Sequence, residues 1–332
     1  MIADINLPIV FAGLMALSVI VYAILDGYDL GVGILLPLSN DKQADQMIAS
    51  IGPFWDANET WLVLAVGLLL IAFPSAHNVI LKALYIPTAI MLVGLILRGV
   101  AFDFRAKVAQ VNKHHWNRIF KLGSCIASTS QGYMLGSFVM GFEDSVSAYV
   151  FATISAIGVT CAYALIGSTW LILKTSDELQ LEAIKWAKLA GKVSFLGILA
   201  VCIVNPLINQ FVFERWTSPP FAYFMAIVPF ACFVLLYLGN LVLKQLPLEG
   251  DSGCWLPFLI TVVVYVFCFC GLTFSFYPYV VPGKLTIWQA ASAPESLGFI
   301  LYGAVIVIPC ILAYTVFSYR VFWGKAQALR YY

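Results

Sequence analysis

The stretch PIVFAGLMALSVIVYAILDGYDLGVGILL, residues 8–36, decides the fold of this chain. Its residues 8–25 carry no charge, and about 20 apolar residues in a helix cross the hydrocarbon core of a bilayer. Asp26 and Asp29 follow in the same apolar run, where an ionisable side chain costs roughly 2.5–3.5 kcal/mol. The stretch therefore predicts a membrane-spanning helix whose carboxylates serve an ion path, a proton relay or a buried cofactor.

The composition of the whole chain agrees with a membrane protein. Of its 332 residues, 62% are hydrophobic and 11% are charged, and the mean hydropathy is +0.93. Soluble domains carry about 25% charged residues. The long continuous apolar runs differ from the short alternating strands of a membrane barrel, so they predict an all-α integral membrane protein. The net charge of +1 and the lack of a basic arm indicate no nucleic-acid partner.

The apolar segments predict nine transmembrane helices. The first lacks a positively charged region and a cleavage site before it, so we expect it to be retained as its own insertion signal. The segments lie at residues 8–36, 52–73, 79–101, 119–141, 148–174, 190–213, 219–243, 255–278 and 296–323.

Lysine and arginine are distributed unevenly between the two sides of these spans. Fourteen of the eighteen lie after odd-numbered spans or in the C-terminal tail, and three lie after even-numbered spans. Loops rich in lysine and arginine stay in the cytoplasm. The asymmetry predicts that the N-terminus lies outside and the C-terminus in the cytoplasm, as an odd number of spans requires.

This orientation brings the ionisable side chains of the first three spans to one depth. No later span carries such a residue in its interior. We expect a charge cluster close to the cytoplasmic face, formed by Asp26, Asp29, Asp56, Glu59, Arg98 and Asp103.

The first motif is D-G-Y-D-L-G-V-G, starting at Asp26. Asp26 and Asp29 are three residues apart and share a helix face. Gly27 and Gly31 form a G-x-x-x-G pair, which allows another helix to approach closely. The motif predicts a tightly packed polar seam. The alternative is that the glycines serve packing alone while the carboxylates reach the headgroup region.

The second motif is W-D-A-N-E-T-W, starting at Trp55. Asp56 and Glu59 share one helix face, and a carboxylate in a low-dielectric site can exchange protons near neutral pH, as a proton relay requires. We expect Trp55, Asn58 and Trp61 to support them structurally. The two tryptophans can alternatively serve as anchors at the membrane interface.

The third motif is R-G-V-A-F-D-F-R, starting at Arg98. A buried arginine needs a partner, and Asp29, Asp56 or Glu59 could each supply it. The alternative is that Arg98 reaches the cytoplasmic surface. Asp103 adds a further charge near the same end of the span.

Cysteine and histidine usage argues against metal and haem sites in this chain. The eight cysteines include no C-x-x-C pair, so a disulfide framework or zinc site is not expected. The histidines, His77, His114 and His115, fall in predicted loops. A transmembrane cytochrome ligates haem from within its helices, so this chain alone is not expected to bind haem.

These three motifs, in this order, resemble those of subunit II of the cytochrome bd quinol oxidases, and the resemblance covers essentially the whole chain. The short chain looks closer to the cyanide-insensitive-type branch. Ala57 stands where the family often has glycine, and alanine suits a helix better than glycine does. Two later features also fit: Tyr277-Pro278 with Trp288, and Leu173-Lys174-Thr175 with Glu178.

The resemblance implies a fold of two four-helix bundles plus one additional helix. Residues 1–141 would form the first bundle with the charge cluster, and residues 142–278 the second. Residues 279–332 would form an outer loop, the ninth helix and a cytoplasmic tail.

The resemblance also implies a function in the bacterial inner membrane. Subunit I of the family carries haem b and haem d and oxidises quinol, while oxygen is reduced to water with protons from the cytoplasm. A small single-span subunit can join, and some members hold a quinone in subunit II. Asp56 matches the proton-path aspartate of the family, and we expect Glu59, Asp29 and Asp26 to belong to the same path.

Two other functions remain as alternatives. One is a structural scaffold subunit without a proton role. The other is a stand-alone proton-coupled transporter, but transporters often repeat their broken helices in both halves. Here the charges are confined to the first half of the chain, which argues against a transporter.

Overall fold

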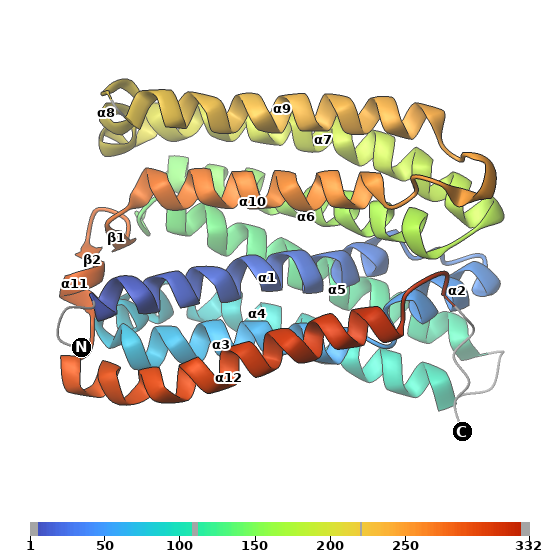
Figure 1. Ribbon diagram of the computed structural model, residues 1–332, viewed down its shortest axis with the longest axis horizontal. Coiled ribbons are helices and arrows are strands. Elements are labelled where there is room, and N and C mark those ends of the chain that lie inside the picture. The colour runs from blue at the N-terminus through green and yellow to red at the C-terminus, as the bar shows by residue number, and fades with distance from the viewer. Residues whose placement is uncertain (1–5, 108–111, 220, 327–332) are drawn as a thin grey trace.

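A computed structural model describes residues 6–107, 112–219 and 221–326 of this chain, and these residues are almost entirely helical (Figure 1). The long helices are α1 (Leu7–Leu35), α3 (Trp55–Ala72), α4 (Pro74–Lys107), α5 (Lys113–Val139), α6 (Val146–Lys174), α7 (Asp177–Ile208), α9 (Phe221–Gln245), α10 (Leu256–Phe276) and α12 (Pro294–Val321).

Short elements connect the long helices. The connections contain α2 (Asp41–Ile51), α8 (Gln210–Thr217), the 3-10 turn η2 (Glu249–Asp251) and α11 (Ile287–Ala290). Strands β1 (Tyr279–Val281) and β2 (Leu285–Thr286) form an antiparallel hairpin in which Tyr279 lies opposite Thr286. The hairpin and α11 lie at the same end of the molecule as the start of α1 (Figure 1).

Eight of the described helices are long and apolar enough to cross a membrane, whereas the sequence predicts nine spans. The long helix outside this set is α5, whose apolar character is lowered by Ser124, Ser128 and Gln131. It packs between α4 and α6, so much of its surface faces protein. Polar side chains are tolerated there because they face other helices. The helix α5 corresponds to the predicted segment 119–141, and its crossing of the membrane stays a prediction.

Several helices extend beyond the predicted spans. His77 lies in the first turn of α4, and His114 and His115 lie in the first turn of α5, so their predicted placement in loops is wrong. The extensions are polar, and a search for apolar segments does not detect them. For the same reason α2 was not predicted, because it carries polar residues on one face and buried apolar residues on the other.

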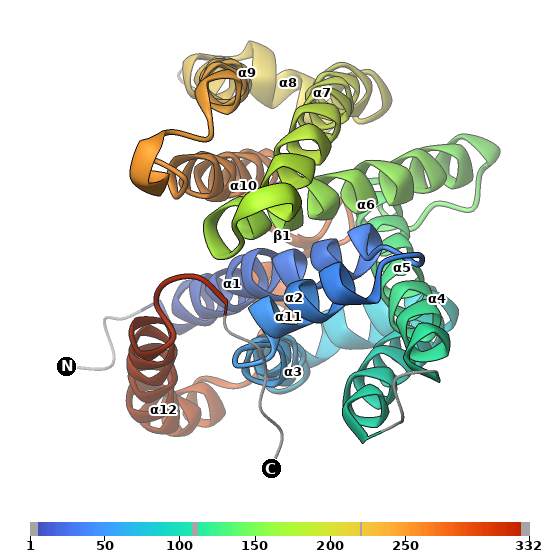
Figure 2. The ribbon, with the colours of Figure 1, turned by 90° about the vertical axis from the view of Figure 1, so that its right-hand side faces the viewer.

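The long helices run side by side along the longest axis of the molecule (Figures 1 and 2). Along this assembly α4 packs on α5, α5 on α6, and α6 on both α1 and α7, while α9 packs on α10. Because α1 and α5 also contact α6, the predicted division at residue 141 lies between packed helices. Helix α12 is peripheral, and many of its large apolar side chains are exposed (Figure 2).

Among the described glycines, the one with the least room for a side chain lies where α1 packs on α6. A Cβ atom added at Gly31 would lie 1.9 Å from the carbonyl oxygen of Tyr163, and one added at Gly167 would lie 2.4 Å from the carbonyl carbon of Gly31. At Gly27 the added atom would lie 2.9 Å from the ring of Tyr163. Small residues let helices approach in this way. The glycines of the first motif thus fix how α1 lies against α6, and with it where Asp26 and Asp29 point.

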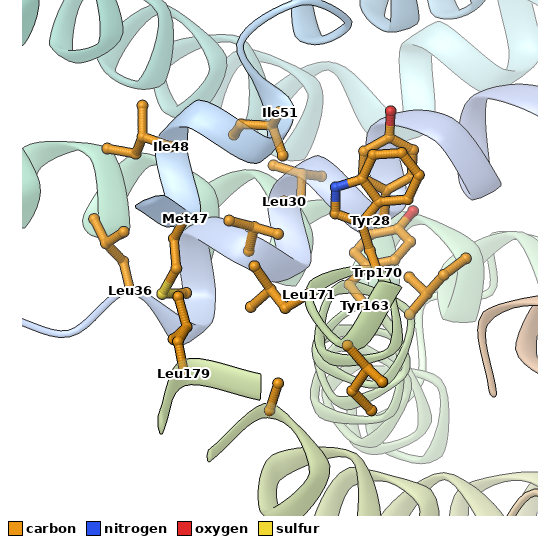
Figure 3. Packing of buried hydrophobic residues seen from close by; sticks show 14 of the residues in the cluster. Tyr28, Leu30, Leu36, Met47, Ile48, Ile51, Tyr163, Trp170, Leu171 and Leu179 are labelled. Atoms are coloured by element: carbon orange, nitrogen blue, oxygen red, sulfur yellow. The ribbon is translucent and has the colours of Figure 1, made fainter. Parts of the chain in front are cut away.

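An apolar cluster supports this contact at the end of the molecule where α2 lies. Tyr28 stacks on Trp170, with ring centroids 4.1 Å apart. Figure 3 shows the apolar face of α2, with Met47, Ile48 and Ile51, against the end of α1. Burial of these side chains anchors α2, and burying one large apolar side chain is worth about 1.5–3 kcal/mol.

The segment after α12 is held at the corner between α6 and α7. The ammonium group of Lys174 donates hydrogen bonds to the carbonyl oxygens of Phe322 (2.7 Å) and Gly324 (3.1 Å). Lys325 donates to the carbonyl oxygen of Thr175 (2.7 Å) and forms an ion pair of 3.2 Å with Asp251. These contacts hold the segment after α12 against the end of α6 and against the turn η2.

We expect the contact between Asp251 and Lys325 to break only in strong acid. The pKa of the Asp251 carboxyl lies below its ordinary value, because Gln180 donates a hydrogen bond to it and Lys325 lies beside it. A carboxyl with a lowered folded pKa contributes stability above its unfolded pKa of about 3.9, and the contribution is lost as the pH falls through the folded value. The Asp251 side chain is 38% exposed. The pair is therefore worth less than about 1 kcal/mol.

The rate at which carboxypeptidase releases the C-terminal residues measures how firmly Lys325 is held by Asp251. A second protease that is active at lower pH extends the measurement into acid. Release of the C-terminal residues should stay constant from neutral pH to about pH 5. Asp251→Asn should raise the release at neutral pH, and Glu143→Gln, at a distant turn, is the control. Equal release from both variants would contradict the role of Asp251.

Candidate functional site

Arg98 of α4 is the centre of a buried ion cluster. Its side chain is 1% exposed, and its Nη2 lies 2.7 Å from Oδ1 of Asp26 and 2.5 Å from Oε1 of Glu59. Asp26 is fully buried, whereas Glu59 is 27% exposed. The guanidinium carbon also lies 5.9 Å from the centre of the Trp55 ring, within the range of a cation–π contact. Three helices therefore meet at one guanidinium group.

The sequence predicted the burial of Arg98 but only one of its partners. Glu59 was among the three carboxylates proposed, whereas Asp26 was not, and Asp29 and Asp56 form no ion pair with Arg98 in the described residues. The alternative in which Arg98 reaches the surface does not fit its burial. Its Nε and Nη1 donate to no acceptor among the described residues, so the described contacts of the guanidinium group are concentrated on Nη2.

A second polar group surrounds Asn58, the neighbour of Glu59 on α3. The Nδ2 of Asn58 donates to Oδ2 of Asp29 (2.8 Å) and to the hydroxyl of Tyr28 (2.9 Å). The hydroxyl of Tyr319 on α12 donates to Oδ1 of Asn58 (3.3 Å) and is hydrogen-bonded to that of Tyr28. Asp29 is fully buried, so this amide holds a buried carboxylate. Asn58 thus joins α1, α3 and α12.

A third polar group continues from α1 toward α5 and α6. The Nε2 of Gln131 donates to the hydroxyl of Tyr22 (2.8 Å), and the hydroxyl of Tyr163 donates to Oε1 of Gln131 (2.6 Å). Tyr22 lies four residues before Asp26 on the same face of α1. This group was not predicted from the sequence. The signal was Gln131, an uncharged polar side chain within a predicted span.

Two acidic residues of the predicted cluster lie outside the buried network. Asp56 is exposed in the first turn of α3, and Asp103 is exposed near the end of α4. Neither forms an ion pair with a described residue. Asp56 precedes Glu59 by three residues, so the two lie about one turn apart on the same side of α3. Asp56 is therefore placed at the surface beside the partly exposed member of the cluster.

The two tryptophans of the second motif have different surroundings. Trp61 is 1% exposed, so it is a core residue and its alternative role as an interfacial anchor is wrong. Trp55 is half-buried and packs on Phe102, with ring centroids 4.8 Å apart. Trp55 thus covers one side of Arg98.

The placement of histidine and of clustered metal-ligand residues bears on haem and metal binding. No group of three or more His, Cys, Asp or Glu residues converges as metal ligands would in the described part of the chain. The histidines lie in the first turns of α4 and α5, away from the middle of any described helix. No axial histidine is therefore available to a haem inside the helices that the structure describes.

Comparison with known proteins gives consistent matches over nearly the whole chain. A family model described as cytochrome bd terminal oxidase subunit II matches residues 7–322. Cytochrome bd-I ubiquinol oxidase subunit 2 of Escherichia coli (strain K12) is 24% identical, covering 94% of this chain and 93% of that protein. Cytochrome bd ubiquinol oxidase subunit 2 of Bacillus subtilis (strain 168) is 28% identical, covering 93% and 94%.

A solved structure shares the fold. A chain in the structure of bd oxidase from Geobacillus thermodenitrificans matches with a TM-score of 0.59 and 8% sequence identity. The match covers 96% of this chain and 99% of that chain.

Proposed function

This chain belongs to the cytochrome bd terminal oxidase subunit II family, and from that premise we propose that it is the haem-free subunit that supplies a cytoplasmic proton path for the reduction of oxygen to water. The observation that carries the proposal is the ion cluster, in which Glu59 is partly exposed while Arg98 and Asp26 are buried. Charged groups thus lead from the surface of α3 into the helical assembly.

The geometry of the cluster suits uptake of one proton. Asp26 and Glu59 both contact Nη2 of Arg98, so two carboxylates share one permanent cation. When one carboxylate takes a proton, the other keeps the ion pair, and the buried arginine is never left without a partner. Arginine does not release its own proton, so it positions the carboxylates and the proton moves on their oxygens.

Asp56 and Asp29 have separate roles in the proposed path. Asp56 is exposed one turn before Glu59 and would collect protons at the cytoplasmic surface. Asp29, held by Asn58, would keep a second buried carboxylate close to the cluster. Proton relays in membrane proteins are built from such chains of acidic side chains.

The proposal includes the membrane arrangement. The chain is a multi-pass protein of the bacterial inner membrane. We propose that α5 is the ninth span, that α12 is added to two four-helix bundles, and that the N-terminus lies outside and the C-terminus in the cytoplasm. The positive-inside distribution of lysine and arginine supports this orientation.

The proposed partner is a haem-bearing subunit I. It would carry haem b and haem d and oxidise quinol, and a small single-span subunit or a bound quinone can complete the complex. Haem chemistry would then lie in the partner, and the residues of this chain would bind the partner and deliver protons. Large apolar side chains are exposed on α3 and α4, among them Val63 at 72% and Ile96 at 63%, which suits contact with another membrane subunit.

We expect Asp56→Asn to slow quinol oxidation severalfold in complex that contains normal haem. The amide cannot carry a proton to Glu59, while its exposed position makes a folding defect small. Oxygen consumption with a soluble quinol, normalised to haem absorbance, measures the effect. Asp103→Asn is the control, because Asp103 is exposed on α4 and forms no ion pair with a described residue.

The same pair of variants separates the proposal from a scaffold role. A scaffold subunit predicts normal turnover per haem for Asp56→Asn and only a change in the amount of complex. Equal turnover in Asp56→Asn and Asp103→Asn would therefore reject the proton path.

A further inference from the structure

A cavity lies among four helices of the second half of the chain, away from the ion cluster. It is lined by α6, α7, α9 and α10 and has a volume of about 350 Å3. This is within the range of roughly 300–1,000 Å3 that ligand pockets occupy. Its lining residues from α9 and α10 lie near the end of α9 and the start of α10, so the cavity is closer to the end of the molecule where the α6–α7 and α9–α10 connections lie (Figure 1).

The cavity exists because small residues stand where helices would otherwise fill the space. Ala187 and Gly191 are one helical turn apart on α7 and line the cavity from that side. Gly239 lines the cavity from α9. A Cβ atom added at Gly191 would approach no closer than 3.8 Å to Leu165, and one at Gly239 no closer than 3.4 Å to Ile260. The rest of the wall is mostly apolar and comes from all four helices, with Leu165 of α6, Phe195 of α7 and Ile260 of α10 among its side chains, which suits a hydrocarbon chain.

Two lysines give one side of this apolar cavity a positive charge. Lys188 and Lys192 both line it, and they are four residues apart on the same face of α7. Neither forms an ion pair with any carboxylate that the structure describes. Lys188 is half-buried and Lys192 is exposed. Their charge is therefore available to a ligand, and Asn240 adds a polar group to the same lining.

We propose that this cavity binds one anionic phospholipid, with an acyl chain between α7 and α9 and the headgroup phosphate on Lys188 and Lys192. Basic pockets between transmembrane helices at the cytoplasmic face bind anionic headgroups. The charge selects an anionic lipid over a zwitterionic one, because the two ammonium groups have no carboxylate to neutralise them. The apolar part selects a lipid over a soluble anion. The site is independent of the proton path, which lies among α1, α3 and α4.

The test measures lipids retained by the purified complex. The complex is exchanged into nanodiscs of phosphatidylcholine with phosphatidylglycerol as the minor lipid, and the lipids that remain bound are counted by native mass spectrometry. We expect one retained phosphatidylglycerol, and Lys188→Gln with Lys192→Gln should lower its retention more than tenfold, since each lysine contributes about fivefold.

Lys185→Gln is the matched control. Lys185 lies on the same helix, is exposed and does not line the cavity. The complex with Lys185→Gln should retain phosphatidylglycerol as the unmodified complex does. An equal loss in Lys185→Gln would show a diffuse surface charge and would overturn the proposal, as would equal retention of phosphatidylcholine and phosphatidylglycerol by the unmodified complex.

Two further measurements separate the cavity from its charge. Gly191→Leu fills the cavity and leaves both lysines in place, so it should also lose the lipid; retention would overturn the proposed position of the acyl chain. In the unmodified complex, phosphatidylglycerol should protect Lys188 and Lys192, but not Lys185, from an amine-reactive label. Equal labelling of the three lysines would overturn the proposal without relying on a variant that must fold.

Discussion

An Arg98→Met variant is expected to give little assembled oxidase complex. Methionine preserves much of the side-chain volume but leaves Asp26 fully buried without its cation, and Glu59 without its partner. Removing one member of a buried ion pair costs about 3–5 kcal/mol, which is a large share of the stability of a typical domain. Haem absorbance of the affinity-purified complex, per cell mass, measures assembly, and a thermal melt of any complex obtained measures stability.

A double variant shows whether the lost charge is the cause. Arg98→Met with Asp26→Asn removes both buried charges, and Glu59 can turn toward water because it is partly exposed. The double variant should recover much of the yield, since replacing both members of a buried pair is far less costly than removing one. Normal yield of Arg98→Met alone, or no recovery in the double variant, would contradict the ion cluster as the structural centre.

Gly31→Ala is expected to destabilise the subunit severely. The added Cβ would lie 1.9 Å from the carbonyl oxygen of Tyr163. The Cβ position is fixed by the backbone of α1 and the oxygen belongs to the backbone of α6, so the two helices must separate. Overpacking costs about 1–3 kcal/mol where side chains can adjust, and a backbone contact places this variant at or above the upper end. The thermal midpoint of the complex should fall by several degrees and its yield should drop.

Two glycines on the same helices serve as controls for Gly31→Ala. Gly13 on α1 and Gly158 on α6 have no heavy atom within 4 Å of an added Cβ. Gly13→Ala and Gly158→Ala should leave the melt unchanged or raise it slightly, because alanine favours a helix by about 1 kcal/mol over glycine. A similar loss in all three variants would indicate a general effect of glycine replacement and would contradict the close contact at Gly31.

The sequence was most informative about elements that depend on local composition. Apolar length alone predicted the long helices α1, α6 and α10 to within a few residues, because every helix that crosses a bilayer needs about 20 apolar residues. Helices α2 and α5 follow a different rule. Both bury their faces against protein and carry polar residues. Apolar length missed α2 altogether, and it predicted α5 as the segment 119–141 without its polar first turns.

The sequence predicted at which end of the first helices the charged residues lie, but it did not predict how each helix is turned about its own axis. Charge asymmetry brought the acidic residues and Arg98 to one end of the first spans. Which carboxylate meets Arg98 depends on how each helix is turned about its axis, and this rotation is set by contacts distant in sequence, such as Gly31 with Gly167. Asp26 therefore points to Arg98, while Asp56 points outward. Gln131 and Tyr319 were missed for the same reason.

The hydrogen bond from Tyr319 to Asn58 has a consequence for biosynthesis. The first and last long helices of the chain meet at this amide, which also holds Asp29. A ribosome that has made every helix but α12 has therefore placed a buried carboxylate and its amide in the bilayer without the hydroxyl group that completes their contacts. Insertion of α12 supplies this hydroxyl group, so the polar contacts that join α1 and α3 are completed only after α12 has entered the bilayer.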